Sequence, residues 1–179
     1  YMYFPVHGTG DGTADQGMSG GASARGNKDA HEVSLTGSVP GIDGLSIGVG
    51  YAGLNYDLPA AQTQTRDEGT AYVKYAAGPF AIGYQLGGVN DKGLGNITYK
   101  NQYLGVSYAV SDDLSVSYNT MESRKINAGY TPEQDFDSFS ISYSMGGMTF
   151  GIADADCGNC TYTAAKTQDE TTVSLSIAF

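Results

Sequence analysis

Apolar and polar side chains alternate, one by one, along most of the chain. The last segment shows this best, because Val173, Leu175, Ile177 and Phe179 are separated from one another by single serine or alanine residues. A period of two is typical of a β-strand whose two faces meet different surroundings. The sequence therefore predicts nine strands of about nine to twelve residues, and residues 1–6 are expected to form the end of a tenth. The other eight alternating segments are centred on residues 33–35, 45–51, 71–77, 80–86, 104–110, 114–118, 139–145 and 148–152.

The segments between the predicted strands are of two kinds, which follow each other in turn. Short turns are expected at residues 40–44, 78–79, 111–113 and 146–147. Long polar loops are expected at residues 7–29, 57–69, 90–99, 124–134 and 156–168, the first of them as a long external loop. This order predicts one all-β domain over residues 1–179, an up-and-down antiparallel meander with its short turns at one end.

The two faces of the predicted strands differ in kind. One face is large, apolar and unbroken, whereas the other is mostly Ser, Gly, Ala and Thr, and the acidic residues are concentrated in the loops. A soluble barrel of this size fills its inside with bulky side chains and carries charges outside. The pattern fits better the inverse arrangement, a transmembrane β-barrel with its apolar face toward lipid and its polar face toward a wet lumen. The expected strand length also suits a bilayer crossing.

Composition narrows the classes of function. The chain has 19 Asp and Glu against 9 Lys and Arg, a formal charge of −10, which argues against nucleic acid as a partner. No run approaches the roughly 18–20 apolar residues of a membrane helix. The chain has 14 Tyr and no Trp. Eight tyrosines lie near predicted strand ends, as aromatic girdles at membrane interfaces require: Tyr51, Tyr56, Tyr75, Tyr84, Tyr99, Tyr108, Tyr118 and Tyr143.

Counting alternate positions identifies candidate lumen residues on the polar face. They are Glu32, Tyr72, Lys74, Gln85, Tyr103 and Asn119. A lysine that projects into a narrow aqueous lumen would tune ion preference. The alternative for Lys74 is an ordinary ion pair with a neighbouring carboxylate.

Catalytic chemistry has no support in the sequence, so an enzyme is not expected. No GxSxG is present, and the pair His31 and Glu32 cannot act together because adjacent strand residues point to opposite faces. No cofactor or metal site is predicted. Four acids near the end of the chain could share a hard cation, but we interpret them as a solvated acidic surface: Asp154, Asp156, Asp169 and Glu170.

The two cysteines, Cys157 and Cys160, form a single CxxC. A zinc site needs four ligands, and a redox motif usually lies at a strand–helix junction. Neither context is visible, so we favour a local loop disulfide formed in an oxidising compartment.

Three segments resemble a known family. Phe179, preceded at alternate positions by Ile177, Leu175 and Val173, is similar to the C-terminal strand that the assembly machinery of bacterial outer-membrane barrels reads as a signal. Residues 74–85 (KYAAGPFAIGYQ) and the turns at 110–118 and 143–148 resemble general diffusion porins, those of alphaproteobacteria in particular. The resemblance covers about residues 30–179.

The resemblance implies a specific architecture and function. A porin of this type is a barrel of sixteen strands that assembles as a homotrimer in the outer membrane, in contact with membrane lipid and lipopolysaccharide, and lets small hydrophilic solutes and ions diffuse passively. Nine strands would be the C-terminal half of such a barrel, because single-chain bacterial barrels have even strand numbers. The constriction loop of the family would then lie outside this sequence.

Three alternatives remain open at this stage. The first is a small complete outer-membrane barrel with a structural or adhesive role through its loops. The second is a soluble β-sandwich or barrel that acts as a binding module. The third, a variant of the porin, is a solute-specific channel.

Overall fold

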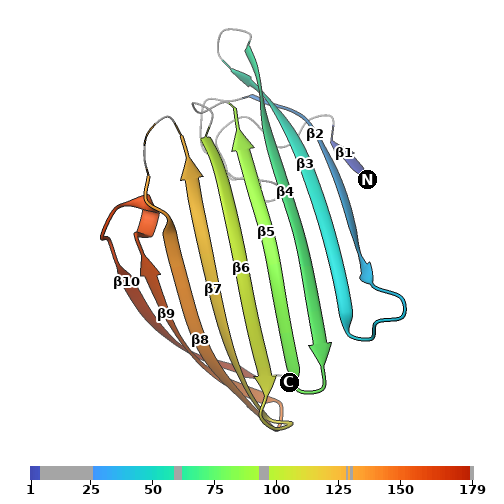
Figure 1. Cartoon of the computed structure of the whole chain (residues 1–179), viewed down its shortest axis with the longest axis vertical. Helices are drawn as coiled ribbons and strands as arrows, with labels where there is room; N and C mark the ends of the chain where they lie inside the picture. Colours follow the sequence, from blue (N-terminus) through green and yellow to red (C-terminus); the bar gives the residue numbers. More distant parts are fainter. Residues whose placement is uncertain (5–25, 59–61, 93–96, 128, 130, 178–179) are drawn as a thin grey trace.

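The computed structural model describes residues 1–4, 26–58, 62–92, 97–127, 129 and 131–177. They form one antiparallel sheet of ten strands, in which each strand pairs with its neighbours in sequence (Figure 1). The all-β, up-and-down meander predicted from the sequence is thus confirmed. The strands are β1 (Met2–Phe4), β2 (Gly26–Ser38), β3 (Leu45–Leu58), β4 (Gln62–Ala77), β5 (Phe80–Asp91), β6 (Ile97–Ala109), β7 (Leu114–Ile126), β8 (Gln134–Met145), β9 (Met148–Gly158) and β10 (Gln168–Ile177).

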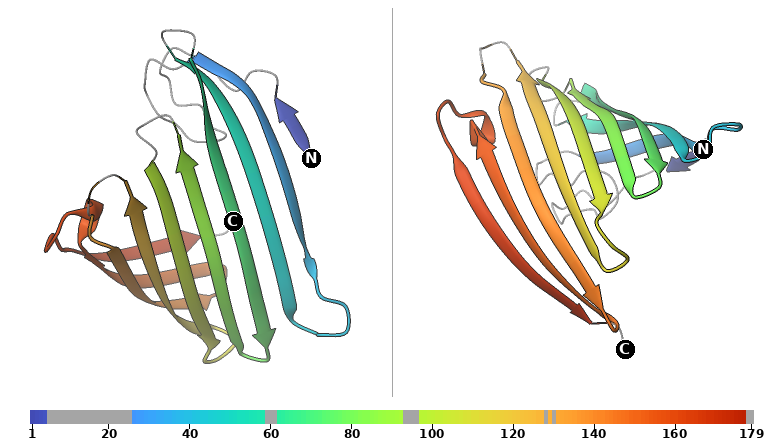
Figure 2. Two further views of the ribbon diagram at one scale, coloured as in Figure 1. Left: turned by 45° about the horizontal axis from the view of Figure 1, so that its top comes forward. Right: turned by 60° about the horizontal axis from the view of Figure 1, so that its bottom comes forward.

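The sheet is open. β1 and β10 form its two edges, and among the described residues neither edge pairs with the other. The strands are coiled and the sheet is curved, with β1 and β10 on opposite sides of the molecule in every view (Figure 2). This open, curved meander is consistent with a β-barrel type of fold, but among the described residues the sheet does not close.

The strands are longer than predicted. β4 has 16 residues and β3 has 14, and their pairing continues to Leu58 opposite Gln62. The prediction of a long loop over residues 57–69 was therefore wrong. Polar residues 62–69 carry no apolar alternation, but backbone hydrogen bonds build a ladder whatever the side chains are. The strand ends consequently extend into segments whose sequence resembles a loop.

The external loop predicted over residues 7–29 does not extend to residue 29. Gly26–Asp29 belong to β2, whereas residues 7–25 lie outside the described residues. Smaller shifts of the same kind occur at the other predicted long loops, because β5, β7 and β9 run past residues 90, 124 and 156.

The short turns all lie at one end of the sheet, as predicted, and we name this the turn end; the opposite end is the loop end (Figure 1). Glycine is required at two of them. Gly146 and Gly147 both have positive φ, 57° and 83°, which a two-residue hairpin needs to match the twist of its strands. Gly44 has φ 80°, and a Cβ there would overlap the backbone oxygen of Ala76.

The sheet has one apolar and one polar face, and cross-strand pairs show which residues share each of them. Ile47 pairs with Val73, Val73 with Tyr84, and Tyr84 with Leu104, so one apolar row crosses four strands. We name this face the apolar face and its large exposed side chains the apolar belt. The belt comprises Val33, Leu35, Ile47, Val49, Val73, Ile82, Leu86, Leu104, Val106, Phe139, Ile141, Phe150, Ile152, Val173, Leu175 and Ile177.

The buried core is small by contrast. Among the described residues, the buried hydrophobic side chains are Ala30, Ala52, Leu54 and Cys160. Leu35, Val173 and others of the belt are exposed, Leu35 to 72%. Most of the hydrophobic side chains therefore lie on the outside of the sheet rather than in a core. No helix within the described ranges is long and apolar enough to cross a membrane.

Candidate functional site

The second face of the sheet, which we name the polar face, collects the six candidate lumen residues. Tyr72 pairs with Gln85, and Gln85 pairs with Tyr103, so these three side chains form one row across β4, β5 and β6. Lys74 and Asn119 share a second row through two glycines, Gly83 and Gly105.

Glu32 completes the set. It pairs with Ala52, which pairs with Glu68, and Glu68 lies at an alternate position to Tyr72 on β4. The register thus places all six residues on one face, as the counting of alternate positions predicted.

The polar face is also the hollow face. A hollow of about 410 Å³ lies over β2–β6 and is lined by Glu32, Glu68, Gln85 and Tyr103 among others. A second, of about 250 Å³, is lined by Tyr72, Lys74, Gln85 and Tyr103, and a third, of about 170 Å³, includes Lys74 and Asn119. The sheet is therefore concave on its polar side, and the predicted residues line the concavity.

Glycines keep this concave wall thin. A Cβ on Gly48 would overlap the ring of Tyr72, its cross-strand partner, and one on Gly105 would lie 2.7 Å from Oδ1 of Asn119. Large side chains thus lie flat over glycines of the neighbouring strand instead of filling the space above them. The glycines at 48–53, which match the pattern GxGxxG, serve packing inside a strand; the next described element is strand β4, not the helix that a dinucleotide site requires.

An ion pair on the polar face was missed by the sequence reasoning. Arg66 Nε lies 2.6 Å from Glu68 Oε1. Arg66 also pairs across the sheet with Asp91, which is buried. The alternation of β4 could have identified this pair, because residues 66 and 68 occupy alternate positions on the same face as Tyr72 and Lys74. The prediction of a loop over residues 57–69 excluded both residues from the strand.

Lys74 differs from Arg66. Within the part of the chain that the structure describes, Lys74 forms no ion pair, so the alternative of a neighbouring carboxylate partner is not seen there. Its side chain borders two of the hollows. A cation in this position places its charge in the water of the concavity.

Tyrosines border the apolar belt at both ends. Toward the loop end, the hydroxyl of Tyr51 donates to Asp67 (2.7 Å) and that of Tyr118 to Asp137 (2.6 Å), while Tyr84, inside the belt between Ile82 and Leu86, donates to Gln102 (2.9 Å). In each case the acceptor lies on the next strand, two residues closer to the loop end than the cross-strand partner of the tyrosine. Toward the turn end, three tyrosines lie within three residues of a turn: Tyr75, Tyr108 and Tyr143.

Two of the described tyrosine side chains, Tyr84 and Tyr99, do not follow this arrangement. Tyr99 lies on the polar face, opposite Lys125 of β7, with its ring 5.8 Å from that of Tyr162; its assignment to an outer girdle was wrong. The alternation at the loop end of β6 places odd-numbered residues on the polar side, and Tyr99 is one of them. The side chain of Tyr56 lies outside the described residues.

The predicted assembly signal lies on the apolar face of the edge strand. Val173, Leu175 and Ile177 are exposed to 63%, 63% and 55%, and Phe179 lies outside the described residues. These side chains face the same surroundings as the rest of the belt.

The late acids do not share one site. Asp156 pairs with Asp137 and Asp169 on the apolar side at the loop end, whereas Glu170 lies on the polar face. In the described residues, no group of three His, Cys, Asp or Glu is arranged to hold a metal ion. A shared ion among all four acids is excluded by their placement on opposite faces.

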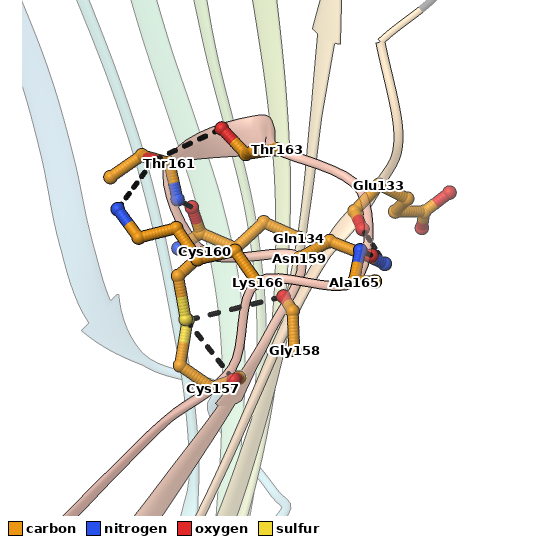
Figure 3. Close-up of a disulfide and its surroundings, with 10 residues drawn as sticks. All are labelled: Glu133, Gln134, Cys157, Gly158, Asn159, Cys160, Thr161, Thr163, Ala165 and Lys166. Atoms are coloured by element: carbon orange, nitrogen blue, oxygen red, sulfur yellow. Dashed lines mark hydrogen bonds between the residues drawn. A yellow bond between two sulfur atoms is a disulfide. The ribbon is translucent and has the colours of Figure 1, made fainter.

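A disulfide joins Cys157 at the end of β9 to Cys160, which begins the short helix η1 (Cys160–Tyr162) (Figure 3). The bond closes the start of the connection between β9 and β10. Among known proteins, no protein-family model and no curated protein matches this chain.

Proposed function

We propose that this chain forms part of the wall of a transmembrane β-barrel in a bacterial outer membrane, through which small hydrophilic solutes and ions diffuse passively. The observation that carries the proposal is that the same strands present an apolar surface on one side of the sheet and a polar surface on the other. The apolar belt is exposed on one face, and the polar, hollow face lies behind it. Soluble monomers rarely expose apolar patches beyond a few hundred Å², so an apolar belt with members on eight strands calls for an apolar solvent.

The tyrosines support the same orientation. The rings of Tyr51 and Tyr118, which lie at the edge of the belt with their hydroxyls hydrogen-bonded away from it, match the amphipathic side chains of a membrane interface. The belt and its two rows of tyrosines would then mark the apolar layer, and the acidic loop end would face water.

The open edges extend the proposal. In lipid, each unpaired backbone group of an edge strand costs several kcal/mol, so the outer edges of β1 and β10 require further strands. The resemblance to general diffusion porins supplies the completed form, a barrel of sixteen strands in a homotrimer. In that form the chain would contribute C-terminal strands, with lipid, lipopolysaccharide and the assembly machinery as its partners.

The polar face gives the proposal its mechanism. Passive diffusion needs a wet path whose width and lining charge select the solute, and no binding or chemical step. Glycines and serines keep the path wide, while Glu32, Glu68, Arg66 and Lys74 place charges of both signs along it. We therefore propose a weakly selective pore, with no catalytic role and no cofactor.

Conductance of the full-length protein in a planar bilayer tests the function. A diffusion pore gives large, stable, nearly ohmic steps, and a trimer gives them in groups of three. Insertion without conductance would contradict the pore and favour a barrel with a structural or adhesive role. Purification as a soluble, monodisperse protein without detergent would contradict membrane insertion itself.

A further inference from the structure

The connection between β9 and β10 does not extend freely from the sheet. We name residues 157–168 the disulfide loop. The side-chain amide of Asn159 donates to the backbone oxygen of Glu133 (2.9 Å), and the backbone N–H of Thr161 donates to Oε1 of Gln134 (3.0 Å) (Figure 3). The loop is thus fastened to the beginning of β8, on the polar side of the sheet, where Gln134 lies.

Tyr162 carries the loop further, past β8 and onto β7 and β6. Its hydroxyl oxygen lies 2.6 Å from Oγ of Ser123, which is 4% exposed. The Ser123 hydroxyl donates to Oδ1 of Asn101 (2.5 Å), so the Tyr162 hydroxyl is the donor to Ser123. Ser123 and Asn101 pair with each other on the polar face. The loop therefore lies over the concave face and not outside it.

A ring contact and a cation complete this attachment. The ring of Tyr162 lies 5.8 Å from that of Tyr99, and Nζ of Lys125 lies 6.0 Å from the centres of both rings. Tyr99 and Lys125 are again a cross-strand pair of the polar face. Contacts of this kind stabilise when they are shielded from water.

The backbone of the loop needs these attachments. All four described non-glycine residues with positive φ lie in it, namely Asn159 (49°), Thr161 (58°), Tyr162 (57°) and Ala165 (59°). Residues with a Cβ are unfavourable in this region, and such conformations persist only when the surroundings hold them. Loss of an attachment should therefore release the loop to another conformation.

We propose that the disulfide loop is a constriction element that narrows the loop end of the pore, with Tyr162 as the latch that holds it against the wall. This inference rests on the proposed function. The loop covers a hollow of about 460 Å³ whose lining includes Phe136, Cys157, Cys160 and Glu170, so the disulfide itself borders the narrowed path. Tyr162 and Lys125 would determine the size and charge of the solutes that pass the mouth.

The test is single-channel recording of the full-length protein with Tyr162→Phe. This variant keeps the ring and removes the hydroxyl that donates to Ser123. Loss of one hydrogen bond changes an equilibrium by about five-fold, so the ratio of dwell times in the lower and the higher conductance level should fall by about five-fold. The double variant Cys157→Ser/Cys160→Ser, which opens the loop ring, should shift the channel further toward the higher level and admit larger polyethylene glycols.

The matched control is Tyr118→Phe. It also removes one tyrosine hydroxyl hydrogen bond, to Asp137, but on the apolar side of the sheet. Its conductance levels and dwell times should equal those of the wild type. Far-UV circular dichroism of each variant checks that the β-content is retained.

The outcomes separate the two proposals. A wild-type channel that conducts, with Tyr162→Phe and the double cysteine variant unchanged in conductance, dwell times and polymer exclusion, overturns the constriction role and leaves the pore intact. A wild-type protein that inserts and never conducts overturns the pore, and the constriction role with it.

Discussion

The two faces of β5 differ in both polarity and shape. Ile82, Tyr84 and Leu86 belong to the apolar face and are exposed, whereas Gln85, between two of them in sequence, borders hollows on the polar face. In a soluble sheet, the apolar side is covered by a second layer. Here the apolar side lies open and the polar side is concave, so the same alternation that usually builds a core builds an outer surface.

A charge introduced on the apolar face is expected to have the largest effect on stability and tests the difference between the two faces most directly. We expect Ile82→Arg to lower the free energy of unfolding in lipid vesicles, by an amount below the about 2–4 kcal/mol that an arginine on the lipid side costs at the bilayer centre, because Ile82 pairs with Tyr75 near the border of the belt. Gln85→Arg, three residues away on the polar face, should change it little. Urea titrations of both variants in vesicles measure the difference, and equal losses would contradict the assignment of the faces.

A methyl group on the concave wall should have the next largest effect. Gly48→Ala overlaps the Tyr72 ring, so we expect a loss of about 1–3 kcal/mol, as in an overpacked core. Gly50 is the matched control on the same strand and face, because its added Cβ would meet its nearest atom, Cγ2 of Thr70, at an ordinary 3.4 Å. Unfolding of Gly48→Ala/Tyr72→Ser checks the cause, since removal of the ring should restore most of the loss. Equal effects at Gly48 and Gly50 would contradict it.

A smaller effect is expected at the border of the belt. Tyr51→Phe removes the hydroxyl that donates to Asp67, and we expect a loss of about 0.5 kcal/mol, the low end for an exposed hydrogen bond. Tyr75→Phe, at the turn end of the neighbouring strand, serves as the comparison. The same unfolding titration measures both, and a loss above that of Gly48→Ala would show that the border tyrosines do more than mark an interface.

The smallest effect on stability, and a clear effect on permeation, is expected at Lys74. Lys74→Gln removes a positive charge from the concave face, so the reversal potential in a salt gradient should move toward greater cation preference. Lys100→Gln also removes one positive charge, but Lys100 lies on β6 on the apolar side of the sheet. The reversal potential should therefore move less in this variant. Equal shifts would mean that the two lysines meet the same water.

The pattern of alternation was sufficient to predict the nine long strands, their order and the face of each candidate residue. It failed at the loop end, where residues 62–69 are polar on both faces and yet pair along β4. Side-chain alternation reports the surroundings of a strand, and at this end both faces meet polar surroundings. Arg66 and Glu68 were misassigned for this reason, whereas Tyr99 was placed by its nearness to a strand end and not by its alternation with Tyr103.

The attachment of the disulfide loop could not be predicted from the sequence. Tyr162 and Ser123 are 39 residues apart in the sequence. In the sheet, β8 lies between β7, which carries Ser123, and β9, from which the disulfide loop begins. No periodicity connects a loop residue to a strand that it crosses. The CxxC spacing, by contrast, was enough to favour the local disulfide that joins Cys157 and Cys160.

The most direct test of the account is the solvent that each face of β5 meets. Nitroxide labels can be placed one at a time at residues 82–86 of the full-length protein in lipid vesicles, because both native cysteines are in the disulfide. Labels at 82, 84 and 86 should be accessible to oxygen dissolved in the lipid, and labels at 83 and 85 to a water-soluble nickel chelate. If labels at 82, 84 and 86 are accessible to neither reagent, the apolar face is a buried protein interface and the membrane pore is contradicted.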